Sequence, residues 1–171
     1  MTPVRTLGLM RLVLAVVTSA VLLLAGCGWS PPGAAPPTPD TCTPAQGPTT
    51  DTVQREISGT APAAPGATWT EVANGHTTDC RLYWVQIAPT SAQPDSPNQV
   101  LFFSGNTPLG PASPDPRPYI SVLPTGEDAV QVQYQWRQGD EPPCCPTGIG
   151  TVRFRIGGDG KLEAVDPIPH G

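Results

Sequence analysis

Hydrophobic and polar residues alternate with a period of two over much of the C-terminal part of the chain. Segment 130–137 is the clearest case, since its apolar residues share one face and its polar residues the other. The apolar set is Val130, Val132, Tyr134 and Trp136. Successive strand side chains point to opposite faces, so this pattern predicts a strand with one buried face. We expect this set to form the centre of the core together with Val152, Phe154 and Ile156 of a second alternating segment.

The remaining elements follow from weaker patterns. Further strands are predicted at 69–72, 82–87, 99–104, 119–123, 151–156 and 161–165, and a hairpin turn at 157–160. One helix is predicted at 50–59, with Thr49 or Thr50 as its cap. Sheets with one polar face are typically antiparallel. The predicted fold is therefore α+β and predominantly β: a single antiparallel sheet of five to seven strands with one short N-terminal helix, stapled by disulfides. The proline-rich segment 105–118 is predicted to be a loop.

Composition narrows the class of protein. The 171 residues include 24 Pro and 18 Gly, which argues against a helix bundle. Only 13% of residues are charged, and the formal net charge is -5. Nucleic-acid binding needs clustered basic residues, which this acidic chain lacks, so no nucleic-acid partner is expected.

The first 27 residues predict a signal for export and lipid attachment. Arg5 and Arg11 precede an apolar run at 12–24, which is shorter than the roughly 20 residues of a membrane-spanning helix. The run ends in Leu-Ala-Gly-Cys, which resembles the bacterial lipobox. That resemblance implies a diacylglycerol on the Cys27 sulfur, with palmitate among the acyl chains. We expect a signal peptide at 1–26, a lipidated cysteine and proline-rich tether at 27–40, and one globular domain at 41–171. The lipid would hold the domain on the extracytoplasmic face of the cell membrane.

Four cysteines remain when Cys27 is lipidated. They are Cys42, Cys80, Cys144 and Cys145, an even number that predicts two disulfides in an exported protein. Three connectivities are open. Neighbouring side chains of extended chain point apart, which favours links from Cys144 and Cys145 to Cys42 and Cys80, in either order. A four-cysteine zinc site is disfavoured, because structural zinc usually draws on cysteines two to four residues apart.

Several blocks appear together in one order. They are Cys80 before 82–85, the run 100–103 followed by Gly105, the strand 130–136, Cys144-Cys145-Pro146, Val152-Arg153-Phe154, and 166–169. In order and spacing the chain resembles the LppP/LprE lipoproteins of mycobacteria and related actinobacteria, over roughly residues 42–169. The resemblance implies a cell-envelope lipoprotein of unassigned biochemical role. It brings no catalytic or binding residues with it.

Candidate chemistry is sparse. His76 and Asp79 in a polar turn are a weak acid–base pair, Asp140 and Glu141 a weak cation site, and Arg153 and Arg155 a weak anion site. We assign no catalytic, cofactor-binding or metal-binding residue. His170 lies next to the C-terminus.

The sequence is compatible with two functions. The first is a non-catalytic structural or interaction module held at the membrane by its lipid, with an envelope protein or lipid as partner. The alternative is a carrier of a small apolar ligand or lipid, because strands 82–87 and 100–103 are apolar on both faces. A carrier needs an enclosed cavity. No residue set supports an enzyme.

Overall fold

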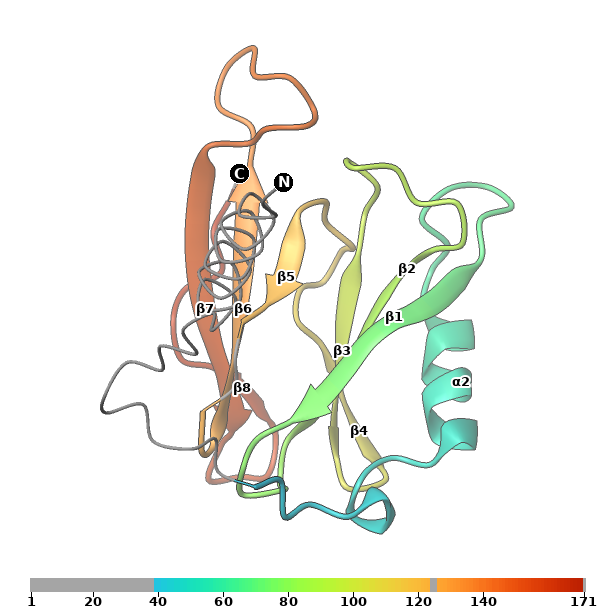
Figure 1. Ribbon diagram of the computed structural model, residues 1–171, viewed down its shortest axis with the longest axis vertical. Helices are drawn as coiled ribbons and strands as arrows, with labels where there is room; N and C mark the ends of the chain where they lie inside the picture. The colour runs from blue at the N-terminus through green and yellow to red at the C-terminus, as the bar shows by residue number, and fades with distance from the viewer. Residues whose placement is uncertain (1–38, 124–125, 171) are drawn as a thin grey trace, which may run out of the picture. The chain divides into compact units, whose positions relative to one another are not determined.

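Eight strands form two antiparallel sheets in the computed structural model, which describes residues 39–123 and 126–170 (Figure 1). The first sheet contains β1 (Trp69–His76), β2 (Tyr83–Pro89), β3 (Gln99–Ser104) and β4 (Thr107–Pro111), paired in chain order. The second contains β5 (Ile120–Val122), β6 (Ala129–Trp136), β7 (Gly148–Ile156) and β8 (Leu162–Ala164), also in chain order. A 3-10 turn, η1 (Pro44–Gln46), precedes α2 (Thr50–Gly59), the one α-helix within residues 39–123 and 126–170. The prediction of a mostly β fold with one helix is confirmed.

The prediction of a single sheet is wrong. Segment 105–118 contains β4 and then crosses from one sheet to the other, so the ladder that begins at β1 ends at Pro111. Pro108 and Pro111 are compatible with β4 because it is an edge strand. The apolar face of β6 and β7 also needs a larger cover than a ten-residue helix provides, and the first sheet supplies it.

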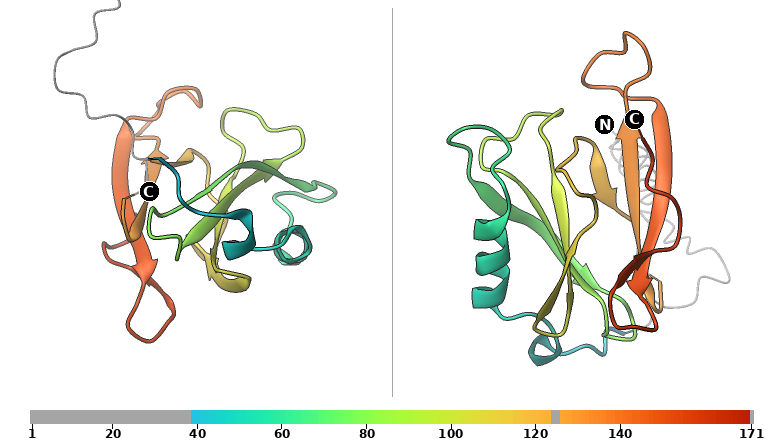
Figure 2. Two further views of the ribbon diagram at one scale, coloured as in Figure 1. Left: turned by 60° about the horizontal axis from the view of Figure 1, so that its bottom comes forward. Right: turned by 180° about the vertical axis from the view of Figure 1, so that it is seen from behind.

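The first sheet is the middle of three layers. On one face, Val100 and Phe102 of β3 pack in a cluster with β6 and β7, where the Phe102 and Phe154 rings lie 5.0 Å apart. On the other face, Leu101 and Phe103 pack with helix α2 through Val53 and Ile57. Figure 2 shows α2 and the second sheet on opposite sides of β3. The two-sided apolar strands therefore have both faces covered by protein.

Helix α2 is tied to this sheet at its first turn. The Thr49 hydroxyl accepts a hydrogen bond from the Thr52 amide at 3.3 Å, which makes Thr49 the cap. The Thr49 amide donates to Asn106 Oδ1 at 2.9 Å, in the turn between β3 and β4. A helix of ten residues is marginal by itself, so these contacts and its apolar face keep it in place.

The predicted buried face of β6 and β7 is largely confirmed. Val130, Val132 and Tyr134 are at most 1% exposed, and Val152 and Phe154 at most 2%. Trp136 and Ile156, at the strand ends, are only half-buried.

In each sheet, a tryptophan ring packs against a glycine of the neighbouring strand. Trp84 pairs with Gly75 across β1 and β2, and a Cβ on Gly75 would lie 2.8 Å from the indole. Trp136 pairs with Gly148 across β6 and β7, where an added Cβ would again overlap the indole. Both glycines are needed because the rings lie directly on the neighbouring strand.

Replacing Val132 by alanine should lower the free energy of unfolding by about 1–3 kcal/mol, from lost burial and partial cavity formation. Gln133→Ala, one position along β6 on the opposite face, is the matched control and should cost under about 0.5 kcal/mol. Urea denaturation of the two variants measures both. Equal losses, or a larger loss for Gln133→Ala, would show that the buried face has been assigned wrongly.

Candidate functional site

The predicted lipidation site, Cys27, and segment 1–26 lie outside the described residues. Among the residues that are described, no helix is long and apolar enough to cross a membrane.

One disulfide joins Cys42 to Cys80, with Cα atoms 5.5 Å apart. Cys80 belongs to the turn between β1 and β2, which is held by a hydrogen bond from the Thr77 amide to the Leu82 carbonyl (2.9 Å) and another from the Cys80 amide to the Thr77 carbonyl (3.0 Å). The bridge fastens the segment before α2 to this turn.

The second disulfide joins Cys144 to Cys145, so the predicted connectivity is wrong. The two cysteines lie in a turn closed by the Cys145 amide and the Pro142 carbonyl (3.1 Å), where the argument from extended chain does not apply. Cys80 is also out of reach. The turn that carries Cys80 is hydrogen-bonded to Gly126 and Glu127, just before the first residue of β6. Cys144 lies beyond the last residue of β6. Eight strand residues separate these ends by about 23 Å, and a disulfide needs Cα atoms within about 7 Å.

A cleft of about 390 Å³, which we call the His76 cleft, opens beside the Cys42–Cys80 bridge between the η1–α2 segment and the ends of β1 and β2. His76 Nε2 lies 3.3 Å from an Asp40 carboxylate oxygen, and His76 Nδ1 lies 3.0 Å from the Thr77 carbonyl oxygen. Both ring nitrogens face oxygen acceptors, an arrangement that holds the ring in place. Asp79, the other member of the candidate acid–base pair, accepts hydrogen bonds from the Thr77 hydroxyl (2.5 Å) and the Arg81 amide (3.1 Å), which hold it in the turn.

Tyr83 lines the same cleft, with its ring 5.4 Å from that of His76. It is only 7% exposed, and its hydroxyl has no hydrogen-bond partner among the described residues. Burial raises the pKa of Tyr83, and the negative charges of Asp40 and Asp79 raise it further, so the phenol stays protonated at neutral pH. Gly47 is required here, because a Cβ at that position would lie 2.8 Å from the Tyr83 ring.

Metal binding is not favoured in the His76 cleft. Donor atoms of Asp40, Cys42 and His76 lie within 4.8 Å of one another. The Cys42 sulfur is committed to the disulfide, so the group offers two ligands, whereas a structural zinc uses four.

The other candidate residues have structural partners. Arg153 makes a two-pronged ion pair with Asp166 (2.9 and 3.0 Å), which lowers the pKa of Asp166 and raises that of Arg153. Arg155 pairs with Glu163 at 2.9 Å. These pairs fasten the C-terminal segment to β7 and leave neither arginine as an open anion site. His170 is exposed at the last described position.

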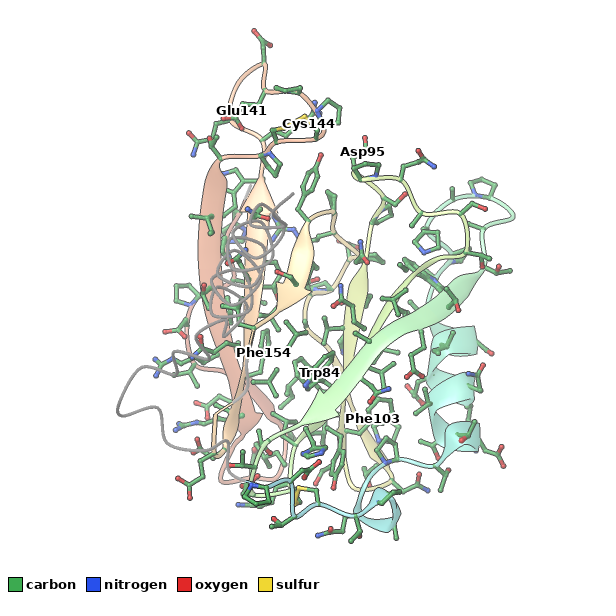
Figure 3. The ribbon with its side chains drawn as sticks, in the orientation of Figure 1. Trp84, Asp95, Phe103, Glu141, Cys144 and Phe154 are labelled. Atoms are coloured by element: carbon green, nitrogen blue, oxygen red, sulfur yellow. A yellow bond between two sulfur atoms is a disulfide. The ribbon has the colours of Figure 1, made fainter. Side chains whose placement is uncertain are left out.

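Glu141 organises the loop between β6 and β7, a role that sequence reasoning missed. Its carboxylate accepts hydrogen bonds from the Gln138 amide (2.8 Å), the Thr147 amide (3.0 Å) and the Thr147 hydroxyl. These bonds lower the pKa of Glu141, the Thr147 hydroxyl contributing most. Figure 3 shows Glu141 and Cys144 in this loop, beyond the ends of the two strands. The carboxylate therefore closes a loop and does not stand as a cation ligand.

A family model described as LppP/LprE lipoprotein matches residues 74–159. A protein of Mycobacterium tuberculosis (strain ATCC 25618 / H37Rv) that carries the name lipoprotein LppP is 55% identical over 145 residues, covering 85% of this chain and 83% of the relative. The chain belongs to the LppP/LprE lipoprotein family.

A protein of the same name from Mycobacterium bovis shows the same identity and coverage. No solved structure matches the chain. The part that the LppP/LprE model matches contains His76, Cys80 and the Cys144–Cys145 turn. The predicted family membership is confirmed.

The lowered pKa of Glu141 gives a pH prediction. Because the folded pKa lies below the unfolded one, the hydrogen bonds to this carboxylate stabilise the loop above the unfolded pKa and are lost as the pH falls through the folded pKa. The NMR shifts of the Gln138 and Thr147 amides should titrate together, with a midpoint below the ordinary value of 4.5. Glu141→Gln should abolish this titration. A midpoint at or above 4.5 would contradict the arrangement.

Proposed function

We propose that this LppP/LprE lipoprotein is exported, anchored by a diacylglycerol on Cys27, and carries a non-catalytic interaction module on the extracytoplasmic face of the cell membrane. The anchor is supported by the basic, apolar and Leu-Ala-Gly-Cys sequence of residues 5–27 and by the family. Two acyl chains on one residue give stable membrane attachment.

The burial of strand β3 favours an interaction module over a lipid carrier. Its side chains from Gln99 to Phe103 are all at most 6% exposed, although they alternate between the two faces of the sheet. One set packs against β6 and β7 and the other against α2. A lipid carrier would need this apolar surface to line a cavity of several hundred Å³. A cleft of about 520 Å³ is bordered by Leu101, Phe102 and Phe103 of β3, but these side chains are at most 6% exposed, so protein side chains already cover most of the apolar surface that a lipid would need.

Catalysis is not favoured by the residues that lie together. The His76 ring nitrogens face Asp40 and Thr77, and the nearest cysteines are oxidised to a disulfide. An activated nucleophile needs a base within hydrogen-bond reach. The His76 cleft is therefore better suited to recognition, with Asp40, Glu71 and Tyr83 among the residues that line it.

Native mass spectrometry of the full-length protein, expressed in an actinobacterial host and released from membranes with detergent, tests the proposal. We expect the polypeptide from Cys27 onward with covalent lipid and with no further lipid bound non-covalently. Cys27→Ala is the matched control and should lack the covalent lipid, leaving an unprocessed precursor or a released protein.

Two results would overturn parts of this proposal. A lipid that accompanies the native protein and separates from it on denaturation would favour the carrier function. Normal acylation and membrane retention of Cys27→Ala would overturn the anchor.

A further inference from the structure

A second pocket lies at the other end of the domain from the Cys42–Cys80 bridge. It has a volume of about 300 Å³ and lies where the chain enters β5 and leaves β6. We call it the arginine pocket, because Arg117 and Arg137 both line it, together with Tyr119, Gln135 and Trp136. None of the described residues that line it carries a carboxylate.

Neither arginine has a carboxylate partner among the described residues, and Arg137 Nη1 donates to the neutral backbone carbonyl of Glu141 at 3.3 Å. Within the described part of the chain neither forms an ion pair, whereas Arg153, Arg155 and Lys161 each do. The chain beyond Cys27 has 14 acidic and 7 basic residues, so unpaired acidic partners are plentiful elsewhere. An anion that enters a pocket lined by two arginines without ion pairs would be attracted by both positive charges.

Arg117 is held in position before any ligand arrives. Its backbone amide and carbonyl both bond to Asn98, at 2.9 and 2.8 Å. Its guanidinium lies 5.5 Å from the centre of the Tyr134 ring, and Nη1 donates to the Pro169 carbonyl at 2.5 Å. A guanidinium has five N–H donors, so this anchoring leaves others for a ligand.

The wall beside it is strained. Tyr119 has a φ of 57°, which side-chain-bearing residues seldom adopt. Its hydroxyl donates to the Pro143 carbonyl at 2.6 Å, and its carbonyl accepts from the Gln135 amide at 3.2 Å. These bonds hold the strained residue between β6 and the loop that carries Cys144. Strain of this kind gathers at ligand sites, where the surrounding structure maintains it.

We propose that the arginine pocket binds the phosphate group of an organic phosphomonoester. Two guanidinium charges match a phosphate group, which carries close to two negative charges at neutral pH, better than a singly charged carboxylate. The pocket volume exceeds that of a phosphate alone, so the organic part would lie against Tyr119 and Trp136. The phosphate could belong to a soluble metabolite or to a lipid headgroup, and the chemistry of recognition is the same for both.

This inference rests on the proposal that the domain is a recognition module. Titration calorimetry of the full-length protein in detergent, with phenyl phosphate as the probe, tests it. We expect binding of phenyl phosphate and at least tenfold weaker binding of benzoate, which has one negative charge. Arg117→Gln and Arg137→Gln should each weaken phenyl phosphate binding by about tenfold or more, because each removes a charged hydrogen-bond donor. Arg81→Gln, in the turn at the opposite end, is the control and should bind as the parent does.

A second titration separates the two sources of phosphate. Dihexanoyl phosphatidic acid presents a phosphomonoester on glycerol, and dihexanoyl phosphatidylcholine presents a phosphodiester with no net charge. Binding of the first lipid through both arginines supports recognition of a headgroup whose acyl chains stay in the membrane, and binding of phenyl phosphate alone supports a soluble ligand.

The inference is overturned if neither phosphomonoester binds at millimolar concentration, or if Arg117→Gln and Arg137→Gln both bind phenyl phosphate as the parent does. Neither result would change the native mass spectrum, in which the absence of non-covalent lipid supports the interaction module. Failure of this inference is therefore distinct from failure of the proposed function.

Discussion

The fold depends on the burial of strand β3 from both sides. Val100 and Phe102 on one face and Leu101 and Phe103 on the other are all at most 6% exposed, so two separate clusters meet in one strand. A strand with two apolar faces requires two covering layers, and the chain supplies a second sheet for one and helix α2 for the other. The short helix and the crossing from β4 to β5 follow from that requirement.

Because the two sheets pack face to face, the two sites for which we propose recognition lie at the ends of the domain. At one end the Cys42–Cys80 bridge, the His76–Asp40 pair and Tyr83 border a cleft. At the other end the loop closed by Glu141 and the strained Tyr119 border the arginine pocket. The two ends differ in charge, since Asp40 and Glu71 line the first while Arg117 and Arg137 line the second. A packed middle with distinct ends is the arrangement expected of a module that presents surfaces to partners.

Local pattern predicted the helix at 50–59 and the buried face of β6 and β7, because both are properties of neighbouring residues. Strand β4 was missed since its prolines lie at a sheet edge, where they are tolerated, and the second sheet was missed since nothing local says which strands pair. The Cys144–Cys145 bridge was misjudged because a turn, and not extended chain, carries it. The partner of His76 is Asp40, 36 positions away, and Arg117 is placed by Asn98 and Pro169, so neither site could be assembled before the fold was known.

The contact between Phe102 of β3 and Phe154 of β7 joins the two sheets and tests the layered arrangement most directly. A double-mutant cycle with Phe102→Leu, Phe154→Leu and the double variant, followed by urea denaturation, isolates their interaction. Packed rings 5.0 Å apart should show a coupling of about 0.5–1.5 kcal/mol. Additive losses, with a coupling indistinguishable from zero, would contradict the packing of one sheet on the other and, with it, the closed interior.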